Sequence, residues 1–141
     1  MGIIDDTLKN KGILAFTQYR LHFMAVLCLM AGADGKIEEA ETKAIHKLVL
    51  ELPEFKDLTP KEVSELTIKA TNKINAFTSP LMAVRLFKEI VEEEARKKCF
   101  WLAVRIALST NSLETEEKDL LEKLQNVLKL SDQFVQDCLT T

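Results

Sequence analysis

The residues best suited to chemistry lie close together in the chain, where Asp34 and Gly35 precede Glu38, Glu39 and Glu41. Carboxylates gathered around one tight bend offer the oxygen ligands that hard divalent cations such as calcium and magnesium prefer. An apolar run precedes the bend and an amphipathic pattern follows it, so we expect a turn between two helices. Asp34, Glu38 and Glu41 are the candidate metal ligands, and Glu39 is a weaker one.

The same residues are also typical of a helix start. Gly35 tolerates the positive φ of a tight turn. Glu38 then takes the cap position, and Glu41 reaches back to the backbone from three residues further on. Acidic side chains in a first turn gain about 0.3–1 kcal/mol from the helix dipole, which also opposes a bound cation. This alternative explains the three glutamates and accounts less well for Asp34, so both interpretations stay open.

The pattern Asp-Gly-x-Ile-x-x-x-Glu matches the second half of an EF-hand calcium loop. The first and third loop positions would then be Met30 and Gly32, which carry no side-chain oxygen. We therefore do not expect a working EF-hand.

Charge and composition narrow the function further. The net charge of −3 comes without a basic stripe, which argues against nucleic-acid binding. The short run 96–98 (Arg-Lys-Lys) is expected to be a solvated face. Only four glycines are present, with no phosphate-binding loop among them, which argues against a nucleotide-dependent enzyme. His22 and His46 are far apart in sequence and predict no catalytic or ligand pair.

Cysteine usage and hydropathy predict a cytoplasmic protein. Cys28, Cys99 and Cys138 are odd in number and share no metal-binding spacing, which indicates a reducing compartment. The start of the chain has no signal-peptide pattern. The longest apolar run, 23–33, is too short to span a bilayer, so we expect no membrane insertion.

The hydrophobic periodicity predicts an all-α fold of about seven helices in one domain. Two of the helices, 13–31 and 98–108, lack a polar face and are expected at the centre of the bundle. Residues 1–12 are expected to be a loosely ordered segment before a helical domain over 13–141. The other expected helices cover 38–52, 60–77, 80–94, 114–129 and 131–139, with caps at Thr59, Ser79 and Ser131.

A shift of 76 residues aligns the chain with itself and predicts two related halves, 13–77 and 79–141. The aligned pairs include Ile37 with Leu113, Glu38 with Glu114, Glu41 with Glu117, Leu48 with Leu124 and Leu52 with Leu128. Asp34-Gly35 becomes Thr110-Asn111. Asn111 can still adopt the left-handed backbone that Gly35 supplies, whereas Thr110 does not replace a carboxylate.

These residues resemble the TerB family of bacterial tellurite-resistance and stress-response proteins. The likeness rests on 33–37 with Glu41, on 113–117, and on the final stretch 128–134. It implies an all-helical fold with metal-binding acidic residues near the turns, here Asp34 and Glu41, with Glu117 in the second half. It also implies protein partners in membrane-associated stress complexes. The second half lacks Asp-Gly, which weakens the case for a second metal site and leaves Glu117 a weaker candidate ligand.

We therefore expect a non-enzymatic TerB-like module whose bound divalent cation fixes the angle between the first two helices. The alternative is a metal-free structural module for protein–protein interaction, in which the acidic residues only shape the turn. A hydrolase is the third and weakest hypothesis. The sequence indicates no organic cofactor and leaves the oligomeric state open.

Overall fold

A computed structural model describes residues 16–33, 39–110, 113 and 115–140. The predicted loose segment 1–12 lies outside these ranges. The described residues contain seven α-helices and no strand, which confirms the all-α class. The α-helices are α2 (Arg20–Ala31), α3 (Glu39–Glu51), α4 (Pro60–Asn75), α5 (Pro80–Ala83), α6 (Glu93–Ala107), α7 (Thr115–Leu128) and α8 (Asp132–Thr140). Short 3-10 helices are η2 (Thr17–Tyr19), η3 (Pro53–Phe55), η4 (Val84–Glu89) and η5 (Leu108–Thr110).

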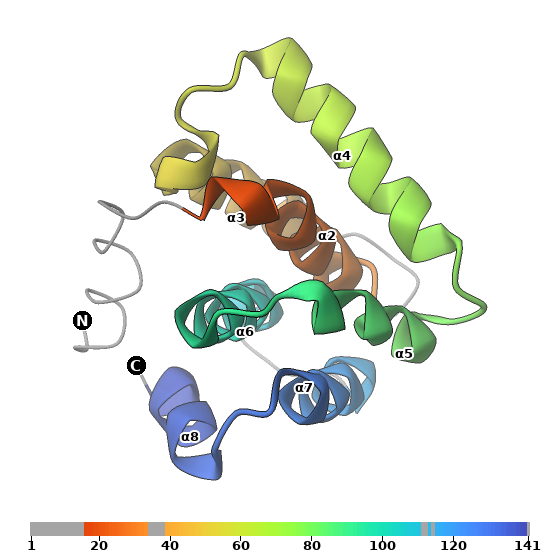
Figure 1. Cartoon of the computed structure of the whole chain (residues 1–141), viewed down its shortest axis with the longest axis vertical. Helices are drawn as coiled ribbons and strands as arrows, with labels where there is room; N and C mark the ends of the chain where they lie inside the picture. The colour runs from red at the N-terminus through yellow and green to blue at the C-terminus, as the bar shows by residue number, and fades with distance from the viewer. Residues whose placement is uncertain (1–15, 34–38, 111–112, 114, 141) are drawn as a thin grey trace.

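Helices α2 and α6 lie against each other at the centre of the molecule, as expected from their apolar sequences (Figure 1). Eight of the twelve residues of α2 are buried, so this helix needs covering on nearly every side. α4 packs along α2, while α7 and α8 lie beyond α6. The core is therefore continuous from α4 through α2 and α6 to α7.

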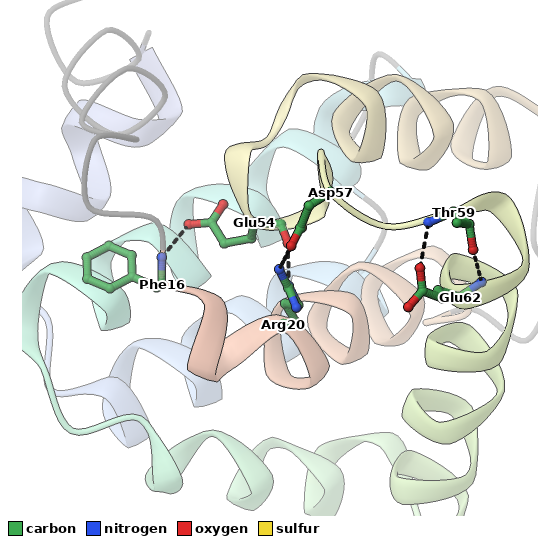
Figure 2. Close-up of polar contacts among 6 residues, drawn as sticks. All are labelled: Phe16, Arg20, Glu54, Asp57, Thr59 and Glu62. Atoms are coloured by element: carbon green, nitrogen blue, oxygen red, sulfur yellow. Dashed lines mark hydrogen bonds and ion pairs between the residues drawn. The ribbon is translucent and has the colours of Figure 1, made fainter.

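Local sequence signals set the start of α4. Thr59 Oγ1 accepts a hydrogen bond from the Glu62 N–H at 3.1 Å, and Glu62 Oε1 accepts from the Thr59 N–H at 2.9 Å (Figure 2). Pro60 occupies the first helical position, where its missing N–H has no intrahelical partner to lose. The predicted cap at Thr59 is therefore confirmed, and Glu62 completes a capping box with it.

The predicted helix over 80–94 is wrong beyond its first turn. Ser79 does cap α5, with the Met82 N–H donating to its Oγ at 3.3 Å, but the α-helix ends at Ala83 and continues as η4. Ile90 is then extended, with ψ of 114°, and is 2% exposed. The Val91 N–H donates to the Tyr19 hydroxyl at 3.1 Å. This distant partner and the burial of Ile90 outcompete a continued helix, so α6 begins at Glu93 rather than Lys98.

The end of α7 and the start of α8 also follow from short-range contacts. Lys129 adopts a left-handed backbone with φ of 56°, and the Leu130 N–H donates back to the Gln125 carbonyl at 3.2 Å. Ser131 Oγ then accepts from the Phe134 N–H at 3.1 Å. The predicted cap at Ser131 is confirmed.

Helix ends recur at the 76-residue offset seen in the sequence. α2 ends at Ala31 and α6 at Ala107, whereas α3 begins at Glu39 and α7 at Thr115. The interpretation of the chain as two related halves stays a prediction, because the turns that join these helices fall largely outside the described residues.

Candidate functional site

The predicted metal site lies mostly beyond the described residues. Asp34, Gly35 and Glu38 are outside them, as is Asn111 of the second turn. Glu39, Glu41 and Glu117 are described.

Glu41 and Glu117 have the same position and the same burial in their two helices. Each is the third residue of its helix, and they are 4% and 3% exposed. A carboxylate there gains from the positive end of the helix dipole. Only Glu41 follows an Asp-Gly pair in the sequence, and yet Glu117 is buried to the same degree. The burial of a glutamate at this helix position therefore does not depend on a preceding Asp-Gly pair.

Glu39 has a different environment from Glu41. Its side chain is 83% exposed, and its Oε1 is 3.3 Å from Lys43 Nζ, one turn further along α3. Exposed pairs of this kind contribute about 0.3–0.5 kcal/mol. Within the described ranges, no group of three or more His, Cys, Asp or Glu side chains is arranged to hold a metal ion. A complete ligand set would need residues from 34–38.

A buried ion pair that the sequence analysis missed joins η3 to α6. Lys98 Nζ is 2.8 Å from Glu54 Oε1 and 2.7 Å from Oε2, and the residues are 2% and 0% exposed. Glu54 Oε2 also accepts a hydrogen bond from the Phe16 N–H at 2.9 Å (Figure 2). Lys98 Nζ lies 6.0 Å from the ring centroids of Phe16 and Phe23, within the range of cation–π attraction.

Arg20 fastens the start of α2 to the same segment. Its Nε donates to the Glu54 carbonyl oxygen at 2.6 Å, and its Nη2 contacts both carboxylate oxygens of Asp57 at 2.6 and 2.8 Å (Figure 2). A planar guanidinium can serve a carbonyl and a carboxylate together, which a lysine ammonium does less well. The start of α2, the end of α3 and the middle of α6 are thus tied together.

The segment after α3 folds so that Glu54 must point inward. Pro53 disfavours a helical conformation at Leu52, which is extended with ψ of 132°. The following 3-10 turn is anchored by Leu52 and Phe55, which are 0% and 2% exposed. Glu54 lies between these anchors, so its charge requires a buried partner.

Lys98 corrects the prediction that run 96–98 is a solvated face. It shares the inner stripe of α6 with Ala95 and Leu102, both 0% exposed. A lysine at that spacing among apolar residues is the one sequence signal of a buried acidic partner, although it does not identify Glu54. Both oxygens of Glu54 are already occupied, so this pair stabilises the fold rather than offering a binding site.

His22 lies at the edge of the core. Its Nε2 is 2.7 Å from Glu89 Oε1, its ring packs edge-on against Tyr19, and its side chain is 13% exposed. Its Nδ1 is buried without a hydrogen-bond partner in the described part of the chain. The contact ties α2 to η4.

The two central cysteines are poor nucleophiles. Burial raises the pKa of the Cys99 thiol above its usual range. Burial also raises the pKa of Cys28, and a hydrogen bond with Thr71 offsets part of that rise. Because the thiolate is the reactive form, both side chains behave as small apolar groups at neutral pH.

These contacts define the class of the protein as an all-helical domain built around two apolar helices. Charged side chains connect these helices to each other and to η3. The family model described as Tellurite resistance protein TerB matches residues 20–138, and the chain belongs to the TerB family. No curated protein and no solved structure matches it significantly. Among the described residues, none of the helices has the length and hydrophobicity needed to cross a bilayer.

Proposed function

We propose that this protein is a non-enzymatic, cytoplasmic module of a tellurite-resistance or related stress response, and that Asp34, Glu38 and Glu41 bind a divalent cation. The observation that carries the cation site is the position of Glu41. Its carboxylate is held at 4% exposure in the first turn of α3, three residues beyond Glu38. A carboxylate in that place can serve as one oxygen ligand of a cation whose other ligands come from residues close by in the sequence.

The proposed cation acts on the joint between α2 and α3. α2 is one of the two central helices of the core, and α3 also contacts α6, so the angle between α2 and α3 affects how α3 is presented to a partner. The ion can shift that angle only by as much as its affinity differs between two arrangements. The partners would be proteins of membrane-associated stress complexes, as family membership suggests.

A metal-free interaction module is the second candidate, and one observation favours it. Glu117 reaches the same burial as Glu41 at the start of α7, where the preceding turn carries Thr110 in place of Asp34. In this alternative both glutamates only stabilise helix starts.

Thermal unfolding of the chelator-stripped chain separates the two candidates. A cation at a hundredfold excess over its Kd adds about 2.7 kcal/mol to the free energy of unfolding, which for a chain of this size raises Tm by roughly 8 °C. We expect calcium, magnesium, manganese or zinc to produce such a rise, and Asp34→Asn to abolish it.

Asp119→Asn is the matched control, because Asp119 is an exposed aspartate on α7. This variant should keep the full response to the cation. If none of the four ions raises Tm at millimolar concentration, or if Asp34→Asn responds like the parent chain, the metal-free module is the better description.

A further inference from the structure

A groove of about 840 Å³ lies between the α5–η4 segment and α7, with α6 contributing to its lining. α5 and α7 run next to each other at this side of the molecule (Figure 1). The volume is within the range of about 300–1,000 Å³ typical of ligand pockets. The groove contains none of the proposed metal ligands.

The lining of the groove is strongly basic. Five cationic side chains contribute to it, and no acidic residue does so within the described ranges; the cations are Arg85, Lys88, Arg96, Lys123 and Lys129. None of the five forms an ion pair with another described residue. A concave surface lined by one sign of charge concentrates the potential and attracts ligands of the opposite sign. This is notable in a chain whose net charge is −3.

Two acidic residues close in sequence to the groove lining are engaged elsewhere. Glu89 follows Lys88 directly, but its Oε1 is 2.7 Å from His22 on α2. Glu92 accepts a hydrogen bond from Gln18 at 3.5 Å. These contacts hold both carboxylates on the α2 side, so they do not neutralise the groove.

Arg96 is the innermost of the five cations. Its Nη1 donates to the Leu128 carbonyl at 3.0 Å, which fixes the guanidinium against the end of α7. Its Nε is buried and has no hydrogen-bond partner among the described residues. A positive charge is thus held at the base of the groove with part of its hydrogen-bonding capacity unused.

The groove is also apolar. Six of its twelve lining residues are hydrophobic, and two of these are exposed: Leu81 at 40% and Val91 at 73%. An anionic ligand that only needed charge would not require this surface. The lining therefore favours a ligand with both acidic and apolar groups.

We propose that this groove binds an acidic peptide segment of a partner protein, with the peptide's apolar side chains against the hydrophobic lining residues and its carboxylates against the cations. The choice of a peptide rests on the interaction role proposed above, and the cation site is not involved. A concave lining favours an inserted segment over a flat membrane surface. No aromatic side chain lines the groove in the described part of the chain, which disfavours stacking of a nucleotide base.

Fluorescence anisotropy with a labelled peptide that alternates Glu and Asp with Leu and Ile tests the proposal. The full-length chain should bind it, with affinity falling as salt is raised. Lys88→Glu combined with Lys123→Glu should raise Kd by about tenfold or more. The matched control, Lys61→Glu with Lys69→Glu on α4, changes the net charge equally outside the groove and should leave Kd within about twofold.

Four results would overturn the proposal. The first is equal binding by the groove variant and the control, and the second is no binding of the peptide to the parent chain. The third is equal binding of an all-glutamate peptide, because the apolar lining would then be unused. The fourth is binding to phosphatidylglycerol-containing vesicles without binding to the peptide, which would assign the groove to lipid. Asp34→Asn is measured in parallel, and unchanged peptide binding by it separates this proposal from the cation site.

Discussion

Lys98 Nζ lies 2.7 Å from Glu54 Oε2 and 2.8 Å from Oε1 in the core, although 44 residues separate the two in the sequence. The pair connects η3, which follows α3, with the inner face of α6. Because the Phe16 N–H donates to the same carboxylate, the entry to α2 depends on it as well. One buried charge pair therefore sets how three segments of the chain meet.

Lys98→Met should lower the free energy of unfolding by about 3–5 kcal/mol, because it leaves the Glu54 carboxylate buried without its cation. Urea denaturation followed by circular dichroism measures this loss. Lys118→Met, at an exposed position on α7, should change the free energy by less than about 0.5 kcal/mol.

Combining Lys98→Met with Glu54→Leu should recover most of the lost stability, because an apolar pair needs no charge compensation. A double variant as unstable as the single one would indicate that packing around Lys98, rather than the unpaired charge, causes the loss.

The burial of Cys99 predicts a loss of stability at alkaline pH. Its pKa is raised above the ordinary value of 9.0, so above that pH the unfolded chain releases a proton that the folded chain retains. The free energy of unfolding should therefore fall by up to about 1.4 kcal/mol per pH unit above pH 9. Below pH 9 both states keep the proton, so the stability is not reduced by this thiol. Urea denaturation from about pH 8 to about pH 10 measures the slope.

Cys99→Ala should have a shallower alkaline slope than the parent chain, because lysine and tyrosine titration is common to both. Identical slopes would show that the Cys99 thiol does not contribute.

The capping box of α4 predicts a moderate effect at an exposed site. Thr59→Ala removes the acceptor of the Glu62 N–H and should lower the free energy of unfolding by about 0.5–2 kcal/mol. Thermal and urea unfolding both report it. Thr78→Ala, at an exposed threonine just before the Ser79 cap, should be close to neutral and serves as the control.

The left-handed residue after α7 predicts a stabilising substitution. Lys129 has φ of 56°, a conformation that glycine adopts without a steric cost. Lys129→Gly should raise the free energy of unfolding by about 0.5–1 kcal/mol, whereas the β-branched Lys129→Val should lower it. A destabilised glycine variant would contradict this explanation of the helix end.

Features that depend on neighbouring residues were predictable. Thr59 and Ser131 were identified as caps because the capping side chain and the N–H it serves are three residues apart. The two apolar central helices were identified because a helix without a polar face has to be covered. The break at 90–92 was missed because the partner of the Val91 N–H is Tyr19, which is 72 residues away.

The candidate sites show the same contrast between features that depend on neighbouring residues and features that depend on distant ones. The acidic residues 34–41 could be singled out because carboxylates, a glycine and their spacing are read directly from the chain, and their metal binding stays a prediction. The burial of Lys98 was not predictable, because Glu54 and Lys98 are brought together only by the packing of η3 against α6. The basic groove was missed for the same reason, since its cations come from η4, α6, α7 and the residue after α7.

The amino-acid sequence by itself determined the helical class, the main helix starts and the place where acidic side chains accumulate, because each depends on residues within one or two helical turns. Only the tertiary structure decided which charges are buried, where the predicted helix 80–94 breaks and how five separate cations line one groove. Burial and charge clustering depend on segments far apart in the chain, and their energies arise only when those segments pack.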